Sequence, residues 1–436
     1  MATPSKNEAI KATMKATRER HAGMLCRVYE VKVVASKLSR QKKELINQMF
    51  REAKWLRNSE LAKGDPKAMD RDAKTAVVKV GDVFETRELT LLGSQIRQDI
   101  VDGIKSEVKG LKTRKSKGEH VGRLKFKTVC NCIPLRQPGM TYRIDSDHST
   151  ISIQGMGRYP LKVRGLEQIP EGAEIANARF IRKASGLYFH ITTYTKPEET
   201  ASAGKCCGID FGIGHNLTLD NGTVYDICIP ETKGVKLASK RVNRAFRRNG
   251  GKKSGQHDKR VLRLRRAYER QNNKKKDQVN KIVSGIVNEY DFIAVQDEMI
   301  AGWHHGLFGK QVQHSSMGAI IAKLKTNSNV HVVPRSFPST QICPACGRLT
   351  KHSLDRREYC CQFCGYTHTS RDAKAAASIL EYAISKVSME RRTQSPVEIG
   401  TNTASIVTDS CCKSPSVKQE AQVLQPWVAH YRSRNP

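Results

Sequence analysis

The stretch CCGIDFGIGHNLTLDNG, Cys206–Gly222, decides the fold of the second half of the chain. Its apolar beginning predicts a β-strand that contains Asp210, and the glycines of the following G-I-G favour a sharp turn. Residues 217–219 predict a strand that returns beside the first one. An acidic side chain inside an apolar strand is unfavourable unless a cation neutralises it. Asp210 is therefore a candidate ligand for a divalent metal ion.

A second candidate acid follows another buried strand, in YDFIAVQDEMIAGW, Tyr290–Trp303. Side chains alternate between the two faces of a strand, so Gln296 and Glu298 share one face and Asp297 points away from it. We expect Glu298 to face Asp210, with Asp297 as the lesser candidate. The alternative is a solvated strand end with two surface acids.

A third acid, Asp372, precedes a helix in HTSRDAKAAASILEYAI, His368–Ile384. The small residues on the apolar face of this helix allow it to approach a sheet closely. Asp372 would then come near the acids of the two strands. The alternative is that Asp372 only interacts favourably with the dipole at the start of the helix.

Four cysteines have the spacing of a zinc site. Cys343 and Cys346 form one C-x-x-C pair, Cys361 and Cys364 form another, and fourteen residues separate the pairs. Two such turns complete a closed, structural site of four thiolates. Cys360 is an alternative to Cys361, but Cys361 repeats the C-x-x-C spacing of the first pair.

The charge of the chain predicts a polyanionic partner. Lys and Arg total 76 against 42 Asp and Glu, a net charge of +34, and such an excess is typical of nucleic-acid-binding proteins. A ribosomal or chromatin-type protein would show the same excess.

The segment Lys233–Lys276 alone contains eighteen Lys and Arg and two acids, interleaved with Phe246 and Tyr268. It predicts a channel for a phosphate backbone, although a solvated charged face is the alternative. The candidate phosphate ligands are Lys240, Arg241, Arg244, Arg247, Arg248, Arg260, Arg263 and Lys275.

Changes of pattern along the chain predict three parts. Residues 1–200 contain an early strand at 24–34 and a run of short strands at 124–195, which we expect to close one β-barrel with a helical insertion at about 37–120. A polar stretch at 198–205 separates them from residues 201–387, which hold the three acids and the cysteine site at 340–367. We expect residues 388–436 to be disordered.

The sequence also bears on location. It has no apolar run of about eighteen residues, the length that spans a membrane, and no apolar signal segment at its N-terminus. Its 13 cysteines are an odd number, which argues against a disulfide scaffold. We expect a soluble intracellular protein in which the isolated cysteines are buried apolar residues (Cys26, Cys130, Cys132, Cys228). Cys411 and Cys412 have no explanation.

In this order the motifs resemble the TnpB family of transposon-encoded RNA-guided nucleases and the compact type V CRISPR effectors. The resemblance spans residues 24–385. In the N-terminal half it includes VYEVKVVASKLSRQKKELINQMFREAKW and LKFK, Leu124–Lys127. It departs from the common pattern at Gln296, where many members have Glu. Ser370 and Lys374 likewise replace the first Asp and the Asn of D-R-D-x-N.

The resemblance implies a multidomain α+β protein. Residues 1–200 would be a wedge barrel with a recognition insertion that binds guide RNA and DNA. Residues 201–387 would be an RNase H-like (RuvC) nuclease domain with an inserted zinc ribbon. Asp210, Glu298 and Asp372 would be catalytic acids that hold two Mg²⁺ ions, beside the structural Zn²⁺.

By the same resemblance, guide RNA would pair with target double-stranded DNA, and the protein would read a short flanking motif. The location would be the cytoplasm of a prokaryote, associated with the nucleoid. Two alternatives remain open: a catalytically inactive RNA-guided repressor, and a transposase that joins DNA strands. Whether the chain acts as a monomer or a homodimer is also open.

Overall fold

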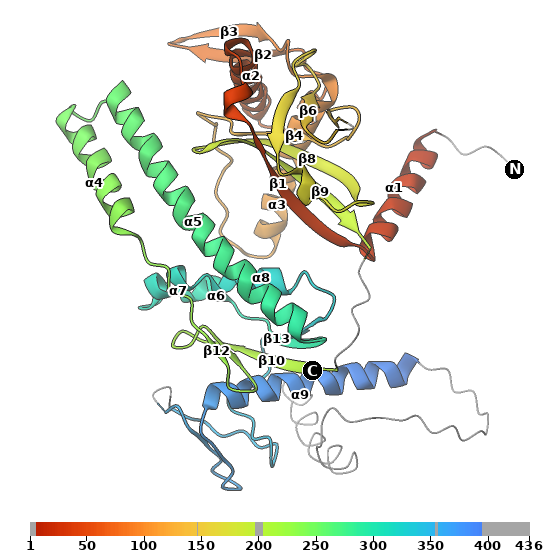
Figure 1. The fold of residues 1–436 in the computed structure, drawn as a ribbon, viewed down its shortest axis with the longest axis vertical. Helices are drawn as coiled ribbons and strands as arrows, with labels where there is room; N and C mark the ends of the chain where they lie inside the picture. The colour runs from red at the N-terminus through yellow and green to blue at the C-terminus, as the bar shows by residue number, and fades with distance from the viewer. Residues whose placement is uncertain (1–5, 146, 197–203, 354–355, 395–436) are drawn as a thin grey trace, which may run out of the picture. The chain divides into compact units, whose positions relative to one another are not determined.

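The structure is a computed structural model that describes residues 6–145, 147–196, 204–353 and 356–394. The chain divides into two compact units, Met1–Glu199 and Thr200–Pro436. Each unit has its own sheet and its own hydrophobic core (Figure 1). The division falls within the polar stretch at 198–205.

The first unit is built on a seven-stranded antiparallel sheet that curls into a nearly closed, barrel-like form (Figure 1). The prediction that the early strand and the later strands share one sheet is confirmed, because β1 pairs with β9 on one side and with β7 on the other. In spatial order the strands are β4 (Cys132–Leu135), β8 (Glu174–Lys183), β9 (Gly186–Thr195), β1 (Leu25–Val33), β7 (Leu161–Arg164), β6 (Thr150–Ile153) and β5 (Tyr142–Ile144).

An insertion lies between β1 and β4. It consists of α2 (Arg40–Ala62), the hairpin of β2 (Thr75–Val80) and β3 (Val83–Glu88), and α3 (Ser94–Ser116). The Ser39 side chain caps the start of α2 by accepting a hydrogen bond from the Lys42 amide. One face of α2 is buried in the core of the unit, as its periodicity predicts. The β2–β3 hairpin was not expected from the sequence.

Three smaller elements complete the first unit. Helix α1 (Lys6–Ala22) precedes β1, and the 3₁₀ turns η1 (Ala35–Lys37) and η2 (Leu166–Gln168) follow β1 and β7. His21 at the end of α1 stacks on the Tyr194 ring of β9, with the ring centroids 3.7 Å apart, and it also contacts Glu174.

The second unit is built on a five-stranded mixed sheet in the order β12-β11-β10-β13-β14. The strands β10, β13 and β14 run parallel, β11 runs antiparallel to β10, and β12 runs antiparallel to β11. This mixed α/β arrangement agrees with the strands predicted around Asp210 and before Gln296. The bounds are β10 (Cys206–Phe211), β11 (Leu217–Leu219), β12 (Val224–Tyr225), β13 (Phe292–Gln296) and β14 (Val330–Val333).

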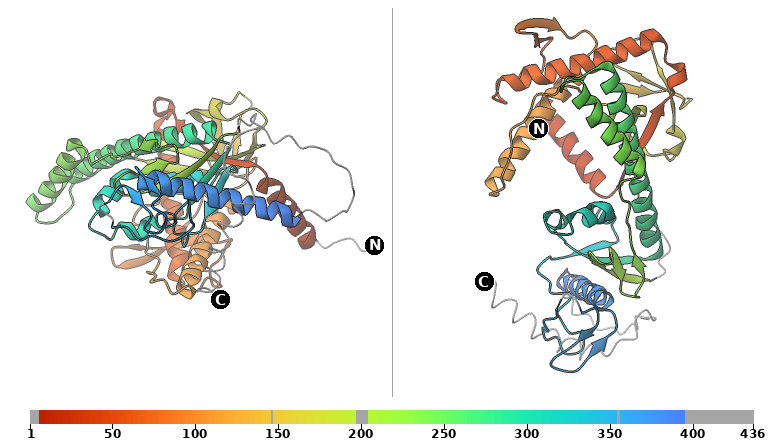
Figure 2. Two further views of the ribbon diagram at one scale, coloured as in Figure 1. Left: turned by 90° about the horizontal axis from the view of Figure 1, so that it is seen from below. Right: turned by 90° about the vertical axis from the view of Figure 1, so that its left-hand side faces the viewer.

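Helices cover both faces of this sheet, and β10 shows how the sequence separates the faces. Cys207, Ile209 and Phe211 alternate into a core shared with α5 (Gly255–Glu289) and α8 (Met317–Leu324). Gly208 and Asp210 face the other side, which is covered by α9 (Arg371–Gln394). Figures 1 and 2 show α9 and α8 on opposite sides of the sheet.

The remaining elements of the second unit extend from this sheet. Helix α4 (Lys233–Arg248) and the first half of α5 form a long hairpin (Figure 2). Short helices α6 (Ile300–Trp303) and α7 (Gly309–Ser315) follow β13. The cysteine ribbon contains β15 (Tyr359–Cys360) and β16 (Thr367–His368).

Helix α9 continues beyond the predicted start of the tail at residue 388 and ends at Gln394. The rest of that predicted tail, residues 395–436 with Cys411 and Cys412, lies outside the described residues.

Candidate active site

Asp210 lies on the face of β10 that packs against α9. The close approach of α9 depends on Gly208, because a Cβ atom there would lie 2.0 Å from the carbonyl oxygen of Ala376. The small residues Ala375 and Ala376 of α9 are fully buried at this contact. The sequence pattern of small residues thus brings the start of α9, and Asp372 with it, to the Asp210 face of the sheet.

The charge environment of Asp210 reports how near the other acids are. Burial, the largest cause, and the negative charges of Asp372 and Glu298 together raise the pKa of Asp210 to about 8. The charges of Arg371 and Lys374 act in the opposite direction. The acids at the end of β13 and at the start of α9 therefore both lie near enough for their charges to act on Asp210.

Asp297 and Glu298 have different surroundings. The Asp297 carboxylate accepts hydrogen bonds from Lys325 and, at 2.7 Å, from Arg335. These cations, with the Lys325 hydrogen bond foremost, lower the pKa of Asp297. Burial raises the pKa of Glu298, and Glu298 has no ion pair within the part of the chain that the structure describes. Of the two acids, Glu298 is the one whose charge acts on Asp210.

Asp372 lies in the first turn of α9, where a helix dipole favours an acid. Its carboxylate pairs with Arg357 at 3.3 Å and with Arg371 at 3.5 Å. The Arg357 guanidinium also lies against the turn after β10, since a Cβ on Gly214 would be 2.5 Å from it. Arg357 thus links the cysteine ribbon, Asp372 and the turn that follows Asp210. Sequence reasoning missed this arginine, because its role depends on contacts between distant segments.

The three acids provide hard oxygen ligands of the kind that Mg²⁺ prefers. Their surroundings fit a cation, since Asp210 faces two further negative charges and is itself partly buried. Their carboxylate oxygens are less tightly grouped than the cysteine sulfurs: among the described residues, the cysteines form the group of ligand atoms that all lie within 4.8 Å of one another.

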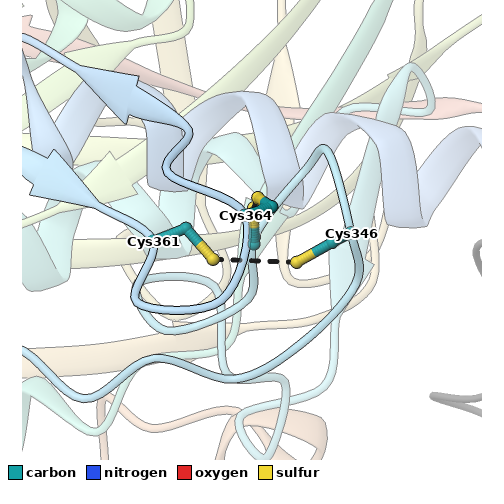
Figure 3. Close-up of side chains that lie close together, drawn as sticks. Cys346, Cys361 and Cys364 are labelled. Atoms are coloured by element: carbon teal, nitrogen blue, oxygen red, sulfur yellow. Dashed lines mark hydrogen bonds between the residues drawn. The ribbon is translucent and has the colours of Figure 1, made fainter.

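Cys343, Cys346, Cys361 and Cys364 form that group. The sulfurs of Cys346 and Cys361 are 3.6 Å apart (Figure 3), as are those of Cys343 and Cys364. Two sulfurs that bind one zinc ion tetrahedrally at about 2.3 Å lie about 3.8 Å apart. The donor set is therefore compatible with structural zinc, as predicted.

The turns of the ribbon explain why these cysteines converge. Gly347 and Gly365 follow the two pairs with φ of 68° and 73°, a left-handed conformation that favours glycine. Their amides donate to the carbonyl oxygens of Cys343 and Cys361. Cys360, the alternative ligand, is exposed and pairs in β15 outside the group.

Two family models match the chain. A model described as a probable transposase (OrfB_IS605) matches residues 189–303, which include Asp210 and Glu298. A model described as Cas12f1-like, TNB domain, matches residues 319–379, which include the four cysteines and Asp372. The chain is TnpB-like. The resemblance to TnpB and the compact type V effectors, inferred from the motifs, is confirmed.

Two further comparisons complete this picture. No curated protein matches the chain at a significant level. Among the described residues of this TnpB-like chain, no helix is long and apolar enough to cross a membrane.

The predicted phosphate ligands of the TnpB-like chain lie on the α4–α5 hairpin. Six of them are exposed: Lys240, Arg241, Arg244, Arg247, Arg248 and Arg263. Arg260 and Lys275 are partly buried and donate to the backbone carbonyls of Arg241 and Gln313. Within the described residues, no acid forms an ion pair with any of the eight. The exposed aromatic rings of Phe246 and Tyr268 lie on the same two helices.

Gln296 and Lys374, where the chain departs from the common TnpB pattern, are both buried. The Gln296 amide nitrogen donates to the Phe337 carbonyl at 2.6 Å, and its oxygen accepts from the Ser339 hydroxyl at 2.8 Å. Lys374 donates to the Ser339 carbonyl at 2.9 Å. Neither residue is therefore free to act as a ligand at the acids.

Proposed function

We propose that this TnpB-like chain is an RNA-guided DNA endonuclease that hydrolyses phosphodiester bonds on an RNase H-type (RuvC) core. The observation that supports this most is the raised pKa of Asp210, caused by burial and by the charges of Asp372 and Glu298. A buried acid with a strongly perturbed pKa beside other acids is typical of functional sites. All three acids also lie within segments that the two family models match.

In the proposed site, Asp210, Glu298 and Asp372 would hold two magnesium ions. Bound magnesium would supply a water of lowered pKa and stabilise the leaving oxygen of the phosphodiester. Burial and its acidic neighbours raise the pKa of Asp210 to about 8, so this carboxyl would release a proton on binding a cation. Asp297 stays outside the site, since Lys325 and Arg335 neutralise it.

The α4–α5 hairpin would hold the nucleic acid by its phosphates. Its six exposed candidate phosphate ligands have no acidic partner among the described residues, so they remain available to a polyanion. The guide RNA would read the target DNA by base pairing, while the protein contacts the backbone and reads a short flanking motif.

The decisive experiment begins with the RNA that copurifies with the expressed chain. We expect a discrete RNA with a constant scaffold and a variable end. Double-stranded DNA that matches the variable end should be cut in Mg²⁺ and left intact in EDTA. Random cellular RNA, or tightly bound DNA that stays intact in Mg²⁺, would contradict the proposal.

A second candidate function is strand transfer, which the description of one matching family as a probable transposase favours. The products separate the two functions. Endonuclease activity leaves free ends, whereas a strand-transfer enzyme joins a cut end to a second DNA.

A further inference from the structure

Lys374 is the buried cation closest in sequence to Asp372. Its side chain is 1% exposed on α9, and an ammonium group in such a place requires bonded partners. The Ser339 carbonyl accepts its hydrogen bond at 2.9 Å, and the Tyr359 ring lies beneath it, with the ring centroid 4.1 Å away. Tyr359 is 0% exposed and packs against Cys343 and Cys361 in the ribbon core. Lys374 therefore joins the acid-bearing helix to the centre of the cysteine ribbon.

Ser339 extends this connection to the strand that leads to Glu298. Its hydroxyl donates to the Gln296 side-chain oxygen at 2.8 Å, while its carbonyl accepts from Lys374. The Gln296 amide nitrogen lies within hydrogen-bonding distance of the carbonyls of Pro334, Arg335 and Phe337. The segment between β14 and the ribbon is thus held from both sides by two buried side chains.

Two of the three departures from the common family pattern, Gln296 and Lys374, suit the hydrogen-bonding groups around them in this arrangement. An ionised glutamate at position 296 would place a carboxylate oxygen, which can only accept, against carbonyl oxygens that also only accept. The amide nitrogen of Gln296 supplies the donor that these carbonyls need. The Lys374 side chain is long enough to donate to the Ser339 carbonyl. A shorter side chain at this position would leave that carbonyl without this donor. Gln296 and Lys374 are each two residues from a proposed acid, Glu298 and Asp372.

We propose that Gln296, Ser339 and Lys374 form a positioning link that sets the spacing between Glu298 and Asp372 and makes this spacing depend on the folded ribbon. The link rests on the proposed role of the acids as a metal site. None of its three residues touches the reacting atoms. They act through the two acids that flank them.

Mn²⁺ binding by the full-length, zinc-loaded chain, freed of nucleic acid, tests the link. Free Mn²⁺ is counted by electron paramagnetic resonance, so no guide RNA or cleavage is required. We expect Lys374→Met to weaken Mn²⁺ binding about tenfold, as loss of a residue that orients metal ligands does. Loss of a nearby positive charge alone would strengthen binding, so the direction of the change identifies positioning.

Lys386→Met is the matched control. Lys386 lies on the same helix and over an aromatic ring, that of Tyr382, with the centroid 5.8 Å from its ammonium nitrogen. We expect this variant to bind Mn²⁺ like the wild type. Ser339→Ala, which removes the hydroxyl and keeps the carbonyl, should weaken binding several-fold. If Lys374→Met loses its zinc or no longer unfolds cooperatively, Mn²⁺ binding by Ser339→Ala decides whether the link exists.

A double-mutant cycle tests whether the residues act as one unit. If they do, Gln296→Met combined with Lys374→Met should bind Mn²⁺ about as weakly as the weaker single variant. Independent effects would multiply and would overturn the link. Unchanged or tighter binding in both Lys374→Met and Ser339→Ala would also overturn it. If Asp210→Asn binds Mn²⁺ like the wild type, the metal site itself fails, and the proposed function fails with it.

Discussion

The two units both bury acids, but they surround them differently. In the first unit, Glu52 is 0% exposed and accepts hydrogen bonds from the amides of Leu91 and Leu92, the Thr90 hydroxyl and the Gln48 side chain. In the second unit, Asp210 faces the charges of Asp372 and Glu298. A buried acid on which several donors converge stabilises the fold through these hydrogen bonds, and we call it a structural tie. Acids that face one another instead leave a site with affinity for cations.

Glu60 and Asp297 fit the first pattern. Glu60 is 1% exposed and is satisfied by Lys63 and the Asp70 amide. Asp297 is satisfied by Lys325 and Arg335. Acids with such partners are expected to stabilise the fold and to be dispensable for chemistry. The predictions below test this distinction, from the largest expected effect to the smallest.

Substitutions of the neighbouring acids Glu298 and Asp297 should differ most in their effect on the rate of guided DNA cleavage. Glu298→Gln should reduce guided DNA cleavage by about 1,000-fold or more, because it removes an anionic ligand of the proposed metal site. Asp297→Asn should leave the cleavage rate within about threefold of wild type, since Asp297 is occupied by two cations. Single-turnover cleavage rates measure both. Equal losses in the two variants would erase the distinction between these acids.

The adjacent cysteines Cys361 and Cys360 should also differ. Cys361→Ser removes a sulfur of the four-cysteine group, so the chain should lose its zinc and its ribbon should unfold. Cys360→Ser should keep one zinc per chain, because Cys360 is exposed outside the group. Metal analysis and thermal unfolding measure the outcome. Zinc loss in Cys360→Ser instead would show that the ribbon uses the other register.

Substitutions of Glu52 and Asp210 should change stability in opposite directions. Glu52→Gln places an amide donor among backbone donors and should destabilise the chain by about 1–3 kcal/mol. Asp210→Asn removes the cost of protonating a buried acid when the chain folds and should stabilise it by about 1–2 kcal/mol at neutral pH. Denaturant unfolding of the full chain measures both. Destabilisation by Asp210→Asn would mean that Asp210 is a structural tie as well.

The smallest effects concern the α4–α5 hairpin. Each exposed cation that binds a phosphate should contribute about 0.9 to the slope of log affinity against log salt. Arg244→Ala should lower the slope for double-stranded DNA binding by about this amount. Lys275→Ala should change it less, because Lys275 already donates to the Gln313 carbonyl. An equal change in the slope for both variants would contradict the distinction between exposed cations and cations that already donate to a backbone carbonyl.

Local patterns predicted much of this structure because their causes are local. The apolar face of α2, the strand before Gln296 and the glycine-assisted cysteine turns each follow from residues near in sequence. The β2–β3 hairpin was missed, although TAVVKVGDVFETRE has alternating β-branched residues around a Gly-Asp turn. The alternation is visible there, whereas the insertion at about 37–120 was predicted to be helical.

The surroundings of the acids could not be predicted in the same way. The sequence placed Glu298 and Asp297 on opposite faces, and the structure assigns them different partners. The cations that engage Asp297 lie 28 and 38 positions further along the chain. The connection from Gln296 through Ser339 to Lys374 likewise joins residues far apart in sequence. Such contacts depend on tertiary packing, which periodicity does not describe.

The perturbed environment of Asp210, on which the proposed site depends, is tested most directly by the stability of wild type and Asp210→Asn as a function of pH. The folded pKa of Asp210 is about 8, raised from the ordinary value of 3.8, so the folded chain holds a proton that the unfolded chain releases. Wild-type stability from this group is therefore present at low pH and lost as pH rises toward 8. The advantage of Asp210→Asn should grow from pH 5 to pH 8 and then level off. A difference that does not change with pH would contradict the account.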